Sequence, residues 1–185
     1  NNVWLITETN VPAHENLEYF GNGNEAHLIY NFSLPPLLVH ALLTGRSTYL
    51  RRWMMSTAPT PDGCTLLNFS ASHDGIGLRP VEGLLPQEEI SRMTETVQSF
   101  RGRLTMRSFG ERNVPYEMNT TLFSALKGTV NGPDTHQIDR FIASQTIMMS
   151  LEGIPAFYVQ SFLAAENDEA RAQQTGQNRS LNRTQ

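Results

Sequence analysis

Four short runs of apolar residues, separated by longer polar or amphipathic stretches, predict four β-strands. The runs cover residues 3–7, 26–32, 65–70 and 156–160, and their lengths are typical of strands. The first run predicts a short buried strand that ends at Glu8. The third is apolar and β-prone, as a strand inside a sheet is expected to be.

Between these runs the apolar residues recur at helical spacing. A helix is predicted to begin at the two prolines of 35–36 and to end at Gly45, because proline suits a first turn and glycine a helix end. A second helix is predicted to begin at 86–89, where two acidic residues lie at the favourable end of the helix dipole. Its apolar face consists of Ile90, Met93, Val97 and Phe100.

The second half of the chain has a less regular pattern. The stretch 103–118 is predicted to be an irregular connection, long enough to suggest a function. A short helix is expected at 119–128, and a longer one after 133–134. One side of the longer helix carries Ile138, Phe141, Ile142 and Met149.

Strands that alternate with helices indicate parallel βα units and an α/β fold. Four such units make half of an eight-stranded (β/α)8 TIM barrel, which typically needs about 250 residues. Four strands also suffice for a small open sheet, and the periodicity alone does not choose between the two.

Composition narrows the class of protein. The chain has 185 residues, of which 39% are hydrophobic and 17% charged, as in a soluble globular domain. No apolar run is long enough for a membrane span, and the net charge of −4 argues mildly against a nucleic-acid partner. The single Cys64 excludes an intrachain disulfide and suits a reducing, cytoplasmic compartment. The first residues run directly into a strand, and the chain is expected to be part of a larger protein.

Two groups of polar residues follow predicted strands. Glu8 ends the first strand, and His73 and Asp74 come shortly after the third, beside a glycine turn. Carboxylates at the carboxyl ends of parallel strands are where α/β barrels build active sites, and such a pair suits acid-catalysed glycosyl transfer. The structural alternatives are an ordinary turn that closes the strand at His73–Asp74, and an exposed loop carboxylate at Glu8.

Seven segments carry a resemblance to a known family, and they occur in the family's order along nearly the whole chain. They are 6–12 (ITETNVP), 19–23 (YFGNG), 31–37 (NFSLPPL), 71–78 (ASHDGIGL), 83–86 (GLLP), 115–119 (PYEMN) and 176–183 (GQNRSLNR). With these segments the chain resembles the sucrose-phosphorylase-like branch of the α-amylase superfamily (glycoside hydrolase family thirteen), and within it the glucosylglycerate phosphorylases above all.

The resemblance implies that residues 1–185 are the C-terminal half of a catalytic (β/α)8 barrel, strands 5–8 with their helices, truncated at both ends. It implies that Glu8 is the general acid/base and Asp74 the transition-state stabiliser. It also implies that His73 donates to glucosyl hydroxyls and that Arg183 holds the far edge of the donor glucose, paired with an aspartate from the other half.

Three further residues match the acceptor side of the family's site. Tyr116 and Glu117 fall on a mobile loop that shapes the acceptor and phosphate side, and some sucrose phosphorylases carry Gln where Glu117 stands. His14 matches an acceptor-side histidine but comes one position later than in the family. The nucleophile, an aspartate in an Arg-x-Asp context, precedes the acid/base in the family, and no such motif precedes Glu8 here.

The implied activity is that of a bacterial, cytoplasmic retaining α-glucoside phosphorylase. It would convert glucosylglycerate, or next sucrose or sucrose 6′-phosphate, with inorganic phosphate as co-substrate and no metal or organic cofactor, to α-glucose 1-phosphate. Hydrolysis or transglucosylation, and a non-catalytic sugar-binding fragment, are the alternatives. Without the nucleophile, the 185 residues alone are expected to be inactive.

Other polar residues invite weaker hypotheses. His27 and His40 are potential metal ligands together with His14 and His73, but no metal-ligand spacing links them, which favours structural roles. The arginines of 101–112 suit a charged surface loop, with phosphate contact as the alternative.

Overall fold

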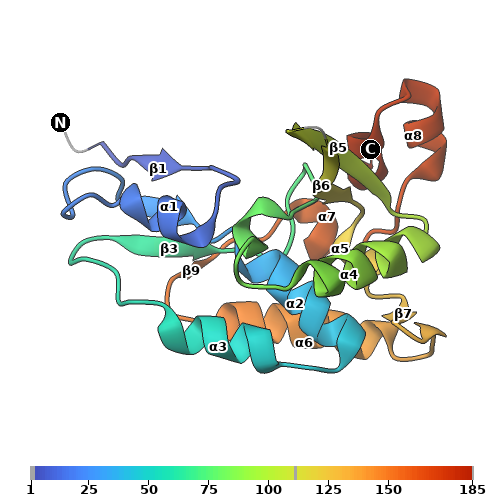
Figure 1. Ribbon diagram of the computed structural model, residues 1–185, viewed down its shortest axis with the longest axis horizontal. Helices are drawn as coiled ribbons and strands as arrows, with labels where there is room; N and C mark the ends of the chain where they lie inside the picture. Colours follow the sequence, from blue (N-terminus) through green and yellow to red (C-terminus); the bar gives the residue numbers. More distant parts are fainter. Residues whose placement is uncertain (1–2, 111, 185) are drawn as a thin grey trace.

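The computed structural model describes residues 3–110 and 112–184. One side of the molecule is a sheet of four parallel strands whose spatial order follows their order along the chain (Figure 1). The strands are β1 (Ile6–Thr7), β2 (Leu28–Tyr30), β3 (Thr65–Asn68) and β9 (Ile154–Pro155). Each neighbouring pair is parallel. The predicted α/β class with a parallel sheet is therefore confirmed.

The two outer strands differ from the predicted ones. The prediction of a buried strand at 3–7 is wrong about burial, because β1 is the edge strand and its Ile6 is 54% exposed. The strand predicted at 156–160 is also wrong. The strand β9 ends at Pro155, before the predicted stretch, and α7 (Val159–Phe162) follows it, with Phe162 N–H donating to the carbonyl of Tyr158. A short apolar run fits one helical turn as well as a strand, which explains the error.

Among the helices in the connections between these strands are α1 (Ala13–Glu18), α2 (Leu34–Thr44), α3 (Thr48–Ser56) and α6 (Gln137–Ser150). The prediction for α2 is confirmed at both ends. Its prolines occupy the first turn, where their missing N–H groups have no helical partner to lose, and Gly45 ends it with a φ of 68°.

The helix α4 (Gln87–Ser99) begins directly after Pro86, as predicted, and carries two acidic residues in its first turn. Its predicted apolar face is buried in the main core. That core contains side chains from α2, α4 and α6 and from the strands around residues 76 and 118. A smaller cluster of Phe20, Ala26, Ile29 and Leu66 packs beside the parallel sheet.

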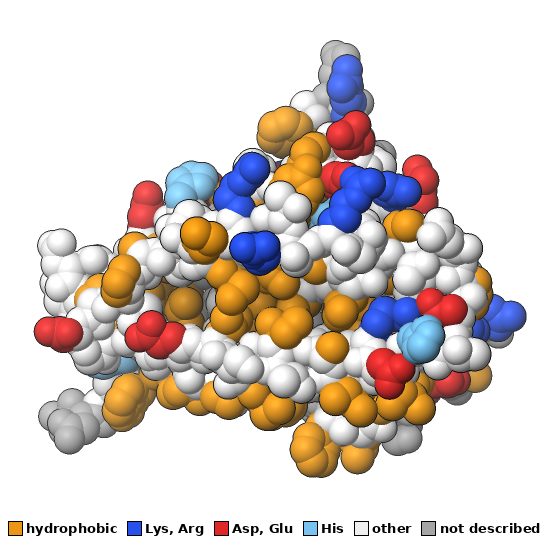
Figure 2. Space-filling model, turned by 90° about the horizontal axis from the view of Figure 1, so that it is seen from below, with side chains coloured by type: hydrophobic (Ala, Val, Ile, Leu, Met, Phe, Trp, Pro, Cys, Tyr) orange, Lys and Arg blue, Asp and Glu red, His pale blue; other side chains and the backbone are white. Residues whose placement is uncertain are grey.

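The predicted apolar side of α6 is mostly outside the core. Ile138, Ile142 and Met149 are exposed, whereas Phe141 packs against the core and Met148 is fully buried. Figure 2 shows the molecule of Figure 1 seen from below, and many hydrophobic side chains are exposed on this face.

The stretch 103–118 is not irregular, so that prediction is wrong. It forms the antiparallel hairpin of β5 (Arg103–Phe109) and β6 (Arg112–Asn119), and β4 (Ile76–Gly77) pairs with the other edge of β6. The hairpin projects above the parallel sheet, on the side of the chain's C-terminus (Figure 1). Apolar residues alternate only over short parts of these strands, at Leu104 and Met106 and at 114, 116 and 118, and arginines and a proline lie among them, which made the strands hard to identify.

Short elements complete the fold. The helix predicted at 119–128 is confined to α5 (Leu122–Ala125), and β7 (Gly128–Thr129) pairs with β8 (Gly132–Pro133). A 3-10 turn η1 (Arg79–Val81) follows β4, and the chain ends in α8 (Glu169–Thr175) and the 3-10 helix η2 (Asn178–Asn182). Among the described residues, no helix is sufficiently long and apolar to cross a membrane.

Candidate active site

A polar pocket of about 320 Å³ lies at the carboxyl edge of the parallel sheet. Glu8 reaches it from the end of β1, and Asp74 from the turn after β3. The predicted convergence of these two carboxylates on one pocket is therefore present in the structure. The residues that line the pocket are Glu8, Asn10, Phe32, Ser72, His73, Asp74, Gly75, Gly77, Tyr116, Glu117 and Arg179.

A tight turn between β3 and β4 presents Asp74 to the pocket. Ser72 and Gly75 exchange two backbone hydrogen bonds, and the Ser72 hydroxyl accepts from the N–H of Asp74 at 3.2 Å. Gly75 has a φ of +117°, and a Cβ there would overlap the carbonyl oxygen of Met118 on β6. Only glycine combines that conformation with that approach, so the turn depends on it.

The Asp74 carboxylate is held through one of its two oxygens. Its Oδ1 accepts from Arg183 Nη2 at 2.7 Å and lies 3.1 Å from Arg179 Nη1 and 3.4 Å from His73 Nε2. The contacts leave Oδ2 available, because every one of them is made to Oδ1.

Glu117 lies on β6 and not on a loop, which corrects the expectation from the resemblance. Its side chain is buried, and its Oε2 accepts from Asn119 Nδ2 at 2.8 Å and from Arg179 Nε at 3.3 Å. Burial raises the pKa of the Glu117 carboxyl above its usual range, and the Arg179 charge opposes that rise only in part.

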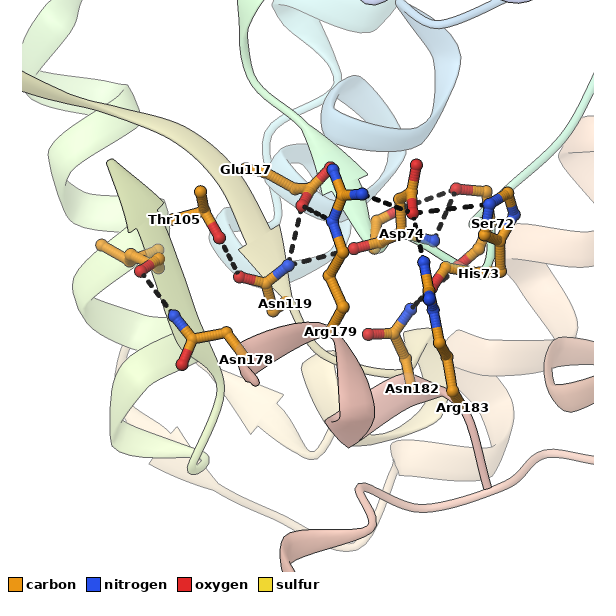
Figure 3. A network of polar contacts seen from close by, with 12 residues as sticks. Ser72, His73, Asp74, Thr105, Glu117, Asn119, Asn178, Arg179, Asn182 and Arg183 are labelled. Atoms are coloured by element: carbon orange, nitrogen blue, oxygen red, sulfur yellow. Dashed lines mark hydrogen bonds and ion pairs between the residues drawn. The ribbon is translucent and has the colours of Figure 1, made fainter. Parts of the chain in front are cut away.

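Residues at the end of the 3-10 helix η2 hydrogen-bond to the turn that carries Asp74 (Figure 3). On η2, Asn182 donates from Nδ2 to the carbonyl of His73 at 2.7 Å and to that of Ser72 at 3.1 Å. Arg183 Nε donates to the same His73 carbonyl at 3.0 Å. The turn that carries Asp74 is therefore held by side chains from the far end of the sequence.

A second hollow of about 240 Å³ adjoins the first, since Glu8, Ser72 and His73 line both. Its wall is aromatic, with Tyr30, Phe69, Phe157 and Tyr158 among its residues. The Tyr30 and Phe69 rings meet edge to face at 5.5 Å. Apolar walls beside polar groups are typical of small-molecule sites.

The structure brings together six of the seven predicted site residues. Glu8, His73, Asp74, Tyr116 and Glu117 line the pocket, and Arg183 contacts Asp74. His14 is different: it lies exposed on α1 and lines neither hollow.

Some residues of the network were not singled out in the sequence, among them Asn119, Arg179 and Asn182. Arg179 and Asn182 fall in the segment 176–183, and Asn119 ends the segment 115–119, so the resemblance already marked both stretches. What the segments did not reveal is which side chain each of these residues contacts.

The other polar candidates have structural partners. The Nδ1 of His27 accepts from the N–H of Leu5 at 3.1 Å, and His40 donates to Glu89 at 2.8 Å inside the core. Among the described residues, no group of three or more acidic, histidine or cysteine side chains is placed to hold a metal ion. Arg107, from the arginine-rich stretch, pairs with Glu82 at 2.6 Å.

Comparisons with known proteins identify relatives along nearly the whole chain. No family model matches it. The chain is 43% identical, over 98% of its length, to a glucosylglycerate phosphorylase from Spirochaeta thermophila, of which it covers 31%. It is 31% identical, over 84% of its length, to a sucrose phosphorylase from Bifidobacterium adolescentis, of which it also covers 31%.

A solved structure shares the fold. Over 98% of its length the chain superposes on 35% of the crystal structure of sucrose 6F-phosphate phosphorylase from Thermoanaerobacter thermosaccharolyticum, with a TM-score of 0.82 and 20% identity. The chain thus spans about a third of the length of the relatives that it matches.

Proposed function

The chain belongs to the family of the glucosylglycerate and sucrose phosphorylases, and we propose that it forms part of a retaining α-glucoside phosphorylase. The single observation that carries this proposal is the shared pocket of Glu8 and Asp74 at the carboxyl edge of a parallel sheet. In barrel enzymes that edge is where catalytic side chains gather.

We assign residues 1–185 to the C-terminal half of a (β/α)8 barrel, with β1, β2, β3 and β9 as barrel strands 5–8. The strand order supports this, because it never reverses as it does in doubly wound open sheets. Both outer strands also expose apolar side chains: Ile6 is 54% and Ile154 is 46% exposed. A closed barrel would cover them with neighbouring strands.

In this proposal four residues act on the donor glucose. Glu8 is the general acid/base, and Asp74 stabilises the oxocarbenium-like transition state through its available Oδ2. His73 donates to glucosyl hydroxyls. Arg183 acts at the far edge of the sugar, and its contact with Asp74 orients that carboxylate.

The reaction is a double displacement with retention. An aspartate from the rest of the protein attacks the anomeric carbon, the bond to the acceptor oxygen breaks, and protonated Glu8 gives its proton to that oxygen. Inorganic phosphate then attacks the anomeric carbon of the glucosyl-enzyme, Glu8 takes a phosphate proton, and the bond from that carbon to the aspartate breaks. The aspartate carboxylate is restored, and α-glucose 1-phosphate leaves. Retention requires the nucleophile and Glu8 carboxyl groups to lie about 5–5.5 Å apart.

Tyr116 and Glu117 form the acceptor-side wall of the pocket. The substrate that we propose first is glucosylglycerate, after the Spirochaeta relative, with sucrose and sucrose 6′-phosphate next. A carboxyl group at position 117 in place of an amide supports an acceptor other than fructose.

The test uses the full-length protein that contains this chain. A panel of α-glucosides is incubated with and without inorganic phosphate, and glucose 1-phosphate and glucose are measured separately. Phosphate-dependent glucose 1-phosphate is the expected result. Free glucose without phosphate would identify a hydrolase instead, and glucoside transfer without phosphate would identify a transglucosidase. The isolated 185-residue chain should show no turnover, and sugar binding without turnover in the full-length protein would identify a binding protein.

A further inference from the structure

Arg179 lies between the two carboxylates that face each other across the pocket (Figure 3). Its Nη1 is 3.1 Å from Oδ1 of Asp74, and its Nε donates to Oε2 of Glu117 at 3.3 Å. Asp74 lies on the donor side and Glu117 on the acceptor-side wall, so one guanidinium spans the two halves of the site. The two carboxylates fix its plane.

These contacts use only some of the hydrogen-bond donors of the Arg179 guanidinium. The group has five N–H bonds; one donates to Glu117, and Nη1 forms an ion pair with Asp74, which leaves at least three N–H bonds for another partner. The Arg179 side chain is 43% exposed, and it lines the pocket. No other lysine or arginine is among the described residues that line it.

We propose that Arg179 binds a negatively charged oxygen group on the acceptor side of the pocket, either the carboxylate of an organic-acid acceptor or inorganic phosphate. The inference rests on the proposed function, because it concerns the second substrate of that reaction. Guanidinium groups pair with carboxylate and phosphate oxygens in a planar, two-bonded geometry. A guanidinium already fixed by Asp74 and Glu117 would lose little freedom when the anion binds.

The charges of the side chains around the pocket determine the pH range in which an anionic acceptor binds. The carboxyl groups of Glu8, Asp74 and Glu117 face the pocket, and Arg179, Arg183 and His73 contact Asp74. With all three carboxylates ionised, an incoming anion is repelled. Protonation of Glu117, which burial favours by raising its pKa, removes one of these negative charges next to Arg179. Selectivity for an anionic acceptor should therefore fall as pH rises through the pKa of Glu117.

The experiment compares glycerate with glycerol, its uncharged analogue, as acceptors in synthesis from glucose 1-phosphate. The full-length protein is assayed as wild type, Arg179→Gln, Arg179→Lys and the double variant Arg179→Gln/Glu117→Gln. Arg179→Gln alone removes the ion-pair partner of the buried Glu117 carboxylate and could impair folding. The double variant also removes that carboxylate, so it tests the inference if the single variant folds poorly. Arg112→Gln, at the exposed end of β6, is the matched control. A second arm measures the KM for phosphate in phosphorolysis.

If Arg179 binds the acceptor's carboxylate, both Gln variants lower the glycerate-to-glycerol ratio of kcat/KM at least tenfold, and Lys retains part of it. If it binds phosphate, that ratio is unchanged and the KM for phosphate rises at least tenfold. Glu117→Gln alone should flatten the pH dependence of the ratio. Equal losses with both acceptors and an unchanged KM for phosphate would overturn the inference. A wild-type protein that forms no glucose 1-phosphate from any glucoside would instead refute the proposed function.

Discussion

Arg183 Nη2 lies 2.7 Å from Oδ1 of Asp74, across 109 positions of sequence. The same guanidinium donates from Nε to the carbonyl oxygen of His73 at 3.0 Å. One side chain therefore holds both the backbone of the turn and the carboxylate that the turn presents. The orientation of Asp74 depends on this double contact.

Replacing Arg183 with lysine keeps the positive charge but removes the double contact, because one ammonium lacks the fork geometry of a guanidinium. We expect Arg183→Lys in the full-length protein to lower kcat/KM by about 100-fold, the loss typical of a misplaced catalytic group. Arg101→Lys is the control, since Arg101 pairs with Glu169 in an exposed position. Steady-state kinetics at saturating phosphate measure both, and an unimpaired Arg183→Lys enzyme would contradict the role of the contact.

Glu8→Gln removes the proposed proton donor. Glucosides with poor leaving groups should lose turnover by roughly 10²–10⁴-fold. The first step with α-glucosyl fluoride, whose leaving group needs no protonation, should be largely spared. Rapid-mixing measurement of fluoride release checks this, with Glu18→Gln as control because Glu18 is exposed on α1 and does not line the pocket. Equal losses on both substrates would argue against the assignment.

Gly75 and Gly83 offer a matched pair, because both have positive φ, +117° and +81°, but different surroundings. A Cβ at Gly83 has nothing within 4 Å, so Gly83→Ala should lower the free energy of unfolding by about 1 kcal/mol. A Cβ at Gly75 would overlap the Met118 carbonyl, which should add about 1–3 kcal/mol. Chemical denaturation measures both. Only Gly75→Ala should also reduce activity, since it displaces Asp74.

The buried Glu89 carboxyl makes the free energy of unfolding depend on pH. His40 Nε2 donates to Glu89 Oε2 at 2.8 Å between α2 and α4, and this hydrogen bond lowers the pKa of the Glu89 carboxyl. A lowered folded-state pKa contributes stability above the unfolded value of 4.5, and that contribution is lost as pH falls through the folded value. Glu89→Gln should therefore cost about 1–3 kcal/mol near pH 7 and progressively less below pH 4.

Denaturation at a series of pH values tests this prediction. Glu88→Gln is the control, because Glu88 is exposed in the same first turn of α4. A cost of Glu89→Gln that stays constant with pH would contradict it.

The sequence predicted those parts of the fold that local chemistry determines. The prolines and Gly45 mark the ends of α2, and the apolar face that begins at Ile90 marks α4. Glu8 and Asp74 were expected together because parallel strands place their carboxyl ends at one edge, and they line one pocket.

What the sequence did not predict depends on contacts between distant residues. The hairpin of β5 and β6 is held by strand pairing, and the apolar alternation in its arginine-rich strands covers only short stretches. Arg179 meets Glu117 from 62 positions away, and no local pattern signals such a pair. The exposure of Ile6 and Ile142 also depends on which elements cover them, and periodicity does not report that.

Glu117→Gln tests the electrostatics of the buried acceptor-side carboxyl. Because burial raises its pKa above the unfolded value of 4.5, the folded protein binds this proton more tightly, and stability falls as pH rises through the folded-state pKa. Glutamine removes the titration and keeps an oxygen that accepts from Asn119 or Arg179. The unfolding free energy of Glu117→Gln minus that of the wild type should therefore increase between pH 4.5 and pH 8. Thermal and chemical denaturation across that range measure it, with the exposed Glu95→Gln on α4 as control. A difference that decreases with pH would mean that the Arg179 ion pair outweighs the cost of burial.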